Sequence, residues 1–537
     1  MKLFDSALKV FDHLREEFEV HIDWNEQMRS LRINCVAQQA VAEENVAAVI
    51  EGIKVKYRDA QAQIVSATPT YIIVPPTSEA IRACIQPEKV VERDSRHIVT
   101  NIKIAGERLA PAALSEWEVS HRRMNEENSK NFRTQAFKRI FELQDLIKWM
   151  RMRIQFGHVN LRQFPQSFLQ GKYSFEMFGE MMKKSRVVSD AVFDRKMEAE
   201  IAINLIQKIV RRRQDFAPKN SRTASLDDVI NNPRNTEIIF ISTAEDREQL
   251  RLEAEVESVE FGALGKYQIG HTRLFADDAR NKLAEITTMD IEREFDWTLE
   301  IIQDSEIKEV PQALRNLIAV SLDNRSAELV DPVGLPYPAI ALRVPIGFKI
   351  KNVVMRSVFQ YQWTPTSNIV EIAIYREWAG VDTRSAPKMQ ASISMFGADW
   401  DMEMESVNDT ISGRNWDKEL SNFFGQEQAH ERSGFKGLMA EIREIQRLLK
   451  TASTEEASKG KLAEEKHQQQ EAENIERQMR ELEVVEHEDL QHSSQEMHQV
   501  NDAEEESRRG DVTSRRTTDR ETTDAPAMAY TPLLIHF

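Results

Sequence analysis

Four carboxylates alternate with apolar residues in the stretch DWDMEMES, and they are the first candidates for chemistry in this chain. The odd-numbered positions are the acidic residues Asp399, Asp401, Glu403 and Glu405, and the even-numbered positions between them are the apolar residues Trp400, Met402 and Met404. This alternation predicts a strand with all four carboxylates on one face. Such a cluster could bind a divalent cation through oxygen ligands or supply an acid/base pair. The same pattern is typical of any strand with one face in water, so we expect these side chains to be solvated.

Basic residues form a second set of candidates between residues 151 and 213. The run RMRIQFGHVNL alternates Arg151 and Arg153 with apolar residues, which predicts a strand that presents both guanidinium groups on one face. Guanidinium and ammonium groups neutralise phosphates and release counterions, so these residues predict a phosphate-binding surface that could contact single-stranded RNA. The candidate RNA contacts are Arg151, Arg153, Lys183, Lys184, Arg186, Arg211, Arg212 and Arg213. The last three follow a helical stripe and could instead complement the dipole of that helix.

No motif in the sequence names a reaction. His158 and His271 are isolated, and no spacing of His and Cys resembles a zinc site. The chain contains no P-loop, no dinucleotide-binding glycine pattern and no nucleophile elbow. We therefore expect a protein that is not an enzyme, with no metal site and no cofactor.

The net charge of −17 is unevenly distributed along the chain. Residues 121–220 hold 21 basic and 11 acidic residues, whereas residues 451–537 hold 10 basic and 21 acidic residues. Local charge decides which surface a polyanion can approach, so the middle of the chain is the expected RNA-binding region. The acidic tail is rich in Glu, Gln and Ser, and this composition predicts disorder.

Targeting features are not found in the sequence. The acid-rich N-terminus resembles neither a secretion signal nor a transit peptide, and no apolar run is long enough to cross a membrane. Cys35 and Cys84 are the two cysteines, which fits a reducing compartment. These features predict a cytoplasmic or nuclear protein.

The first 63 residues predict the order helix, strand, strand, helix. Alternating apolar residues in FEVHIDW indicate a half-buried strand, the polar NEQM indicates a turn, and an Ala-rich helical stripe follows the second strand. In the order of its elements and in its sequence, the stretch VHIDWNEQMRSLRINC with the helix that follows resembles the second half of a KH domain. This resemblance implies a fold that contacts single-stranded RNA. The unit could equally serve only for packing.

The nucleotide-clamping loop of a KH domain has no good match in this sequence. The first strand, the first helix and the GxxG loop that KH domains use for this purpose are expected before Met1. A GxxG match at Gly262–Gly265 lies between two strand-like runs and is better explained as a hairpin turn. A second match at Gly434–Gly437 begins a helix, but no strand pair follows it.

The remaining elements predict an α+β fold with an antiparallel β-rich C-terminal domain. A long helix is expected over residues 112–149, and a change of apolar parity at Gly157 predicts a β-bulge. Short apolar runs after residue 236, including AIALRV, predict strands, with helical breaks at Asp277–Lys282 and Pro311–Ala319. The predicted divisions are a partial KH-like unit (1–76), a basic and mainly helical region (77–217), a linker (218–235), the antiparallel β-rich domain (236–410), a linker and helix (411–450) and the disordered acidic tail (451–537).

Taken with the N-terminal stretch, the phrase MRMRIQFGHVNL…GKYSFEMFGEMM is similar to a fungal protein family. In that family a degenerate KH-type module precedes a domain of unknown function. The resemblance implies no activity and no catalytic residues. Two functions therefore stay open. The first is RNA binding through the basic surface beside the KH-like unit. The second is a scaffold that binds protein partners through the β-rich domain or the acidic tail, with the KH-like unit only structural.

Overall fold

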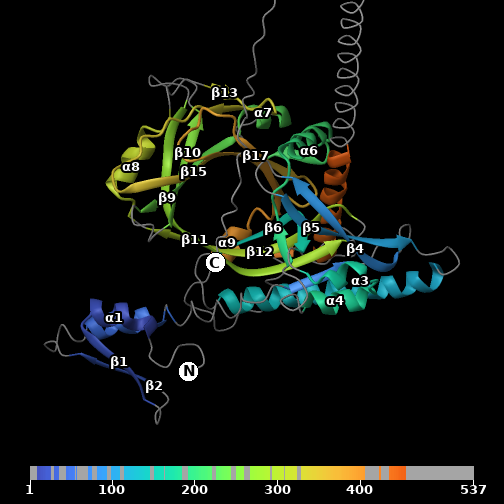
Figure 1. The fold of residues 1–537 in the computed structure, drawn as a ribbon, viewed down its shortest axis with the longest axis horizontal. Helices are drawn as coiled ribbons and strands as arrows, with labels where there is room; N and C mark the ends of the chain where they lie inside the picture. Colours follow the sequence, from blue (N-terminus) through green and yellow to red (C-terminus); the bar gives the residue numbers. More distant parts are fainter. Residues whose placement is uncertain are drawn as a thin grey trace, which may run out of the picture. The chain divides into compact units, whose positions relative to one another are not determined.

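The computed structural model has an α+β fold, as the sequence predicts (Figure 1). The structure describes residues 9–25, 30–35, 44–54, 56, 70–74, 82–93, 98–108, 114–144, 150–161, 164–183, 191–219, 225–243, 249–258, 267–290, 293–307, 309–322, 328–405, 423–424 and 434–454. The predicted disordered tail and the GxxG match at 262–265 lie outside these residues, apart from the first four residues of the tail, which end a helix.

The N-terminal unit has the predicted order of helix, hairpin and helix. Its elements are α1 (Asp12–Glu17), β1 (Val20–Asn25), β2 (Ser30–Cys35) and a helix over residues 44–54. β1 and β2 pair antiparallel, and a small core of Phe11, Leu14, Val20, Ile22 and Val49 joins them to the two helices. The Asn45 side chain donates a hydrogen bond to the carbonyl oxygen of Phe18 at 3.2 Å. The likeness of this unit to a KH domain stays a prediction.

Eight of the eleven strands in the largest sheet form a closed ring. In order around the ring, the strands are β10 (Gln249–Ser258), β9 (Arg234–Thr243), β15 (Phe348–Trp363), β16 (Ile369–Ala379), β17 (Lys388–Phe396), β6 (Arg151–Leu161), β12 (Asp296–Ile307) and β11 (Tyr267–Asp290). The ring closes because β10 pairs with both β9 and β11, and every neighbouring pair in it is antiparallel. Closure leaves no free strand edge and divides the side chains into an inner and an outer set.

The closed sheet joins regions that the sequence divides. β6 belongs to the predicted helical region 77–217, yet it lies between β17 and β12. β3 (Thr70–Val74) adds a parallel pairing at the end of β11. The predicted linker contains α7 (Leu226–Asn231), which begins with a capping box in which Ser225 and Asp228 bond each other's backbone N–H groups.

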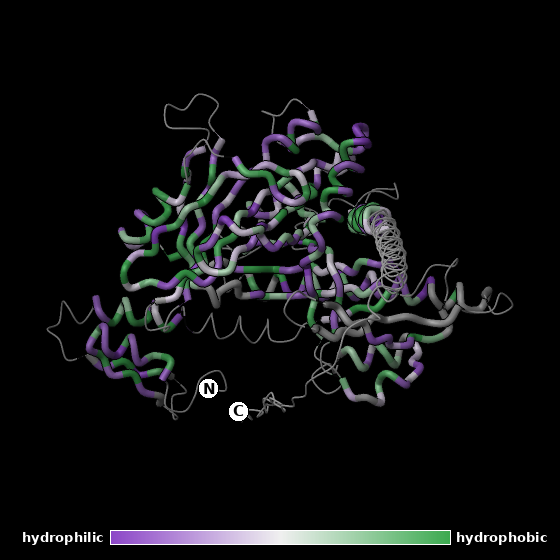
Figure 2. The backbone as a smooth tube through the Cα atoms, turned by 45° about the horizontal axis from the view of Figure 1, so that its top comes forward, coloured by the Kyte–Doolittle hydropathy of each residue, from purple (hydrophilic) through white to green (hydrophobic). Residues whose placement is uncertain are grey.

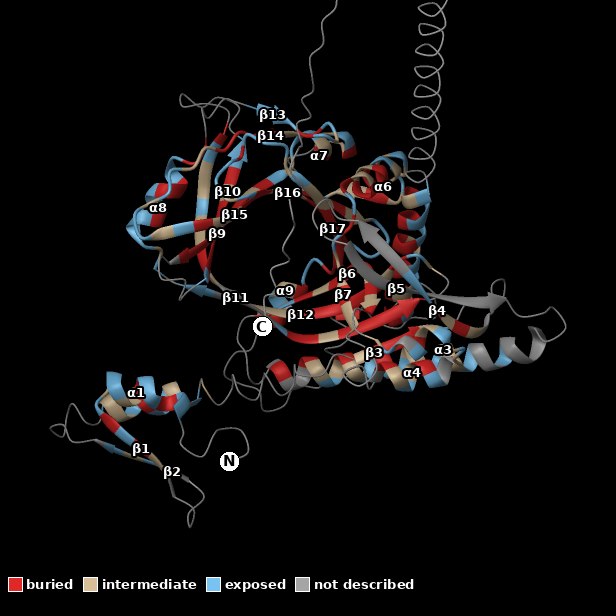
Figure 3. Ribbon diagram, in the orientation of Figure 1, coloured by how far each residue is buried: buried red, intermediate tan, exposed pale blue. Residues whose placement is uncertain are grey.

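Helices cover the apolar outer face of the closed sheet. α3 (Leu114–Gln144), α6 (Ala199–Arg211) and a helix over residues 434–454 share one hydrophobic core with β6, β16 and β17. α8 (Gln312–Ala319) packs on a second core with β9, β10 and β15. Figure 3 shows the buried residues along these strands and along α6. In Figure 2, hydrophilic and hydrophobic residues are mixed along the strands, as expected when one face is covered and the other is polar.

Gly157 marks the point where β6 changes partners. Residues 151–157 pair with β12, and residues 158–161 pair with β7 (Ala191–Asp194). These pairings run without a register shift, so the predicted bulge is not found here. Met152, Ile154 and Phe156 belong to one core and Val159 and Leu161 to another, which accounts for the change of parity. A Cβ atom at this position would lie 2.0 Å from the carbonyl oxygen of Asp194, which requires glycine here.

Two further predictions about local structure are wrong. The helical break expected at Asp277–Lys282 is part of the long strand β11, where Arg280 and Asn281 pair with Asp304 and Gln303 of β12. The AIALRV run forms no strand and contributes only an isolated bridge between Ile340 and Leu322. In both places pairing with distant segments decided the backbone, and a local pattern does not contain that information.

Candidate anion-binding site

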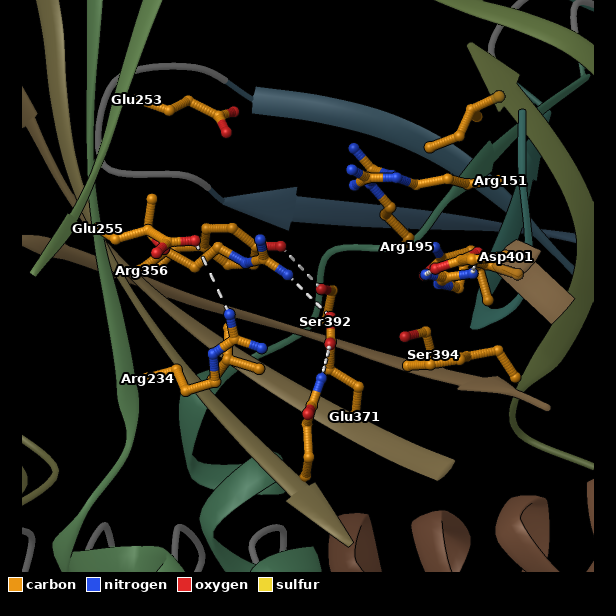
Figure 4. A pocket seen from close by; sticks show the side chains of 18 of the residues that line it. Arg151, Arg195, Arg234, Glu253, Glu255, Arg356, Glu371, Ser392, Ser394 and Asp401 are labelled. Atoms are coloured by element: carbon orange, nitrogen blue, oxygen red, sulfur yellow. Dashed lines mark hydrogen bonds and ion pairs between the residues drawn. The ribbon is translucent and has the colours of Figure 1, made fainter. Parts of the chain in front are cut away.

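The inner face of the closed sheet is strongly charged. The lining residues recur at every second position along each strand, as in Arg151, Arg153 and Gln155 of β6, so they share the inward parity. Around this space lie seven arginines, one lysine and four carboxylates. They are Arg151, Arg153, Arg195, Arg234, Arg251, Arg273, Arg356 and Lys219, with Glu253, Glu255, Glu371 and Asp401. We call this space the charged pocket; it has a volume of about 330 Å³, and Figure 4 shows several of these side chains pointing into it.

Each carboxylate of the charged pocket is held by a guanidinium group. Arg356 donates to Glu371 at 2.8 Å, and the Gln360 amide donates to the same carboxylate at 2.7 Å. Glu255 lies 3.8 Å from Arg234 (Figure 4). Glu253 lies between two arginines, with Arg251 at 2.9 Å and Arg273 at 3.6 Å. With eight cations facing four carboxylates, the charged pocket keeps an excess of positive charge.

Burial and neighbouring cations lower the pKa of Lys219. Desolvation lowers the pKa of its ammonium group, and the guanidinium of Arg234 lowers that pKa further. Lys219 and Arg153 both lie over the ring of Phe396, with their cationic groups 5.5 and 3.9 Å from its centroid. A cation that is disfavoured by its neighbours gains stability when an anion binds beside it.

The predicted carboxylate strand is a helix. Residues Trp400–Glu405 form α9, in which Trp400 and Met404 are buried four positions apart while Met402 is exposed. The Trp400 indole donates to the carbonyl oxygen of Phe423 at 2.7 Å and fixes the helix after β17. The acidic residues alternate in sequence, but of the two candidates whose side chains the structure describes, Asp399 and Asp401, only Asp401 lines the charged pocket.

The structure brings two of the eight predicted RNA contacts together. Arg151 and Arg153 line the charged pocket. Arg211 is exposed at the end of α6, Arg212 pairs with Glu444 and Asp215, and Arg213 pairs with Asp227 at 2.7 Å. Lys183 ends α4 (Phe175–Lys183), and its side chain, like Lys184 and Arg186, lies outside the described residues.

Several pocket residues were missed by the sequence analysis. Arg251, Arg273 and Arg356 lie in the predicted β-rich domain, whose net charge is negative, and Arg234 lies in the predicted linker before it, so regional charge did not point to them. The feature that could have identified them is an arginine among the alternating polar residues of several separate strands. Polar side chains on one face of a strand are expected to face solvent unless the sheet closes around them.

The described residues hold neither a metal-binding cluster nor a membrane-spanning helix. No group of three or more His, Cys, Asp or Glu side chains there is arranged to hold a metal ion. No described helix has the length and apolar character to cross a membrane.

Comparisons with known proteins give a family and a remote structural likeness. No curated protein matches the sequence. The solved structure of the S. pombe Pct1 RNA triphosphatase matches with a TM-score of 0.28 and 8% identity, over 60% of this chain and 92% of that one. The same enzyme in complex with the Spt5 CTD gives the same score and identity over 53% and 89%. A score this low assigns neither fold nor function. Residues 115–430, more than half of the chain, match the family described as a domain of unknown function (DUF7905), and the protein belongs to that family.

Proposed function

We propose that this protein binds ligands that carry a chain of phosphate groups inside the closed sheet, and that it binds them without turnover. The observation that carries the proposal is the charged pocket, in which cations from five strands and two adjoining segments face one space. Strands hold these side chains on a rigid frame, so the positive field is present before the ligand arrives.

Guanidinium groups favour phosphate among the possible anions. The planar fork of arginine donates two parallel hydrogen bonds to phosphate or carboxylate oxygens, and arginine stays charged when it is desolvated. The charged pocket has an excess of four positive charges in about 330 Å³. A ligand with several negative charges close together neutralises this excess best. An oligophosphate chain supplies them in linear order, whereas a single carboxylate would leave most of the cations unmatched.

The pairing of the carboxylates with arginines supports binding without turnover. A general base or a metal ligand needs an oxygen lone pair that is open to water or to a cation. Glu253, Glu371 and Asp401 each accept or pair with arginine in the charged pocket. These carboxylates already form ion pairs with arginines of the pocket, which supports a binding role.

RNA enters this proposal as one source of phosphates. Arg151 and Arg153 face inward, so an RNA that contacts them presents an end or a flexible strand to the charged pocket. Direct RNA contact by the KH-like unit is a separate proposal, and the order of its helices and hairpin supports it. The protein-scaffold function is the outcome that remains when neither RNA nor oligophosphate binds.

Calorimetric titration of the full chain with inorganic tripolyphosphate tests the proposal. Arg151→Gln removes one charge from the charged pocket, and Arg211→Gln removes one at the exposed end of α6 as the matched control. We expect a loss of affinity of about tenfold for the first variant and less than about twofold for the control, since charge-assisted hydrogen bonds contribute roughly 1.5–3 kcal/mol. Equal effects of both variants, or phosphate release with time, would contradict the proposal.

A further inference from the structure

The interior of the closed sheet has a second section with different chemistry. A cavity of about 410 Å³ adjoins the charged pocket, and both are lined by Arg195, Arg251, Tyr375 and Ser392. The shared residues make the two cavities parts of one interior. We call the second one the mixed section.

Apolar side chains form one wall of the mixed section. Ile238, Phe240 and Val354 line it from the neighbouring strands β9 and β15. Phe240 follows the inward parity of Thr236 and Ile238, and its ring is only partly buried. Tyr375 of β16 is also partly buried and lies where the two sections meet. A partly exposed ring that lines a cavity is a surface on which a planar group can stack.

Polar groups stand around this apolar wall. Asn352 pairs with Phe240 across the strands, and its amide donates to Glu377 at 2.9 Å. Gln390 adds a second amide, which carries both donor and acceptor groups. A bare oligophosphate would use neither the apolar wall nor these amides. A planar heterocycle with polar edges would use both.

We infer that the ligand is a nucleotide whose phosphates occupy the charged pocket and whose base lies against Phe240 in the mixed section. The inference rests on the proposed function and names its ligand class. Arg195 and Arg251, which both sections share, contact the phosphates nearest the sugar. The rings of Phe240 and Tyr375 exclude water from the base, and stacking of a base on such a ring is tolerant of its identity.

Calorimetric titrations of the full chain with adenosine triphosphate and with inorganic tripolyphosphate test this inference. The wild-type protein is expected to bind the nucleotide about tenfold more tightly, the amount that one stacked base supplies. Phe240→Ala is expected to lower nucleotide affinity about tenfold and to leave tripolyphosphate affinity within about twofold. Phe240→Leu keeps the apolar volume without the ring, so it shows the same selective loss if the alanine variant is too unstable to measure.

The outcomes separate the inference from the proposal on which it rests. Equal affinity for both ligands, or a Phe240 variant that weakens both equally, overturns the nucleotide inference and leaves oligophosphate binding in place. Binding of neither ligand overturns both. Titration with the guanine and uracil nucleotides then distinguishes stacking, which gives similar affinities, from recognition of one base by Asn352 and Gln390.

Discussion

Arg153 of β6 and Asp401 of α9 form a bidentate ion pair in the charged pocket, although 248 residues separate them in the sequence. The two nitrogen–oxygen distances are 2.6 and 2.7 Å. The Arg153 side chain is 15% exposed and the Asp401 side chain is 44% exposed. Asp401 therefore occupies, from the more open side, the same fork that an anionic ligand would bind.

Replacing Asp401 by asparagine should strengthen oligophosphate binding. The change removes a negative charge that competes with the ligand for Arg153 and keeps the size of the side chain. We expect tripolyphosphate affinity to rise about three- to tenfold, measured by calorimetry at low salt. Asp399→Asn is the matched control, because Asp399 is exposed next to α9 and does not line the charged pocket. A loss of affinity in Asp401→Asn would show that this carboxylate positions Arg153 for the ligand.

The arginine triplet at the end of α6 should contribute to stability and not to oligophosphate binding. Arg212 donates to Glu444 of the 434–454 helix, and Arg213 pairs with Asp227 of α7. Alanine at all three positions is expected to lower the free energy of unfolding by about 1 kcal/mol, since exposed and half-exposed ion pairs contribute little. Tripolyphosphate affinity should stay within about twofold of wild type, because none of the three lines the charged pocket. A large loss of affinity with unchanged stability would place the binding surface on α6.

The stability of the protein should depend on the protonation of Glu237. Its carboxyl group is fully buried in β9 and accepts a hydrogen bond from the Ser321 hydroxyl, and burial raises its pKa to about 7. The folded state therefore holds a proton that the unfolded chain releases near pH 4.5. Folding stability contributed by this group is full at low pH and falls as the pH rises from about 4.5 through 7.

Glu237→Gln removes this dependence and keeps the shape of the protonated acid. The variant should match the wild type near pH 5 and exceed it at pH 8 by up to about 3 kcal/mol, an upper bound from the shift in pKa. Thermal melts of both proteins at the two pH values measure the difference. A gap in melting temperature that is the same at both values would show that Glu237 is ionised in the folded protein.

Glycine at position 157 should be required for the fold of β6 and β7. A methyl group there would meet the backbone of Asp194 and Arg195 at 2.0 and 2.9 Å, so β7 would have to move. We expect Gly157→Ala to destabilise the protein by more than about 2 kcal/mol and to weaken tripolyphosphate binding, because β7 leads into Arg195 of the charged pocket. Gly179→Ala on α4 is the control. Its nearest neighbour would be 4.0 Å away, and alanine favours a helix, so denaturant unfolding should show no loss of stability there.

The sequence predicted local elements well and their assembly poorly. Alternation placed Arg151 and Arg153 on one strand face, and helical stripes located α6 and the 434–454 helix. Closure of the sheet depends on pairings such as Trp297 with Phe156, between residues far apart in the sequence. Without those pairings an arginine on the polar face of a strand is expected in solvent, and the charged pocket cannot be recognised. α9 was mistaken for a strand because its acidic residues alternate, although Trp400 and Met404 also fit a helical spacing.

The central claim is that the interior of the closed sheet binds an oligophosphate. Titration of the full chain with inorganic tripolyphosphate at low and at moderate salt, with Arg151→Gln and Arg211→Gln in parallel, tests it most directly. The predicted result is one saturable site that weakens with salt and loses about tenfold affinity only in Arg151→Gln. Absence of saturable binding by the folded protein at low salt would contradict it.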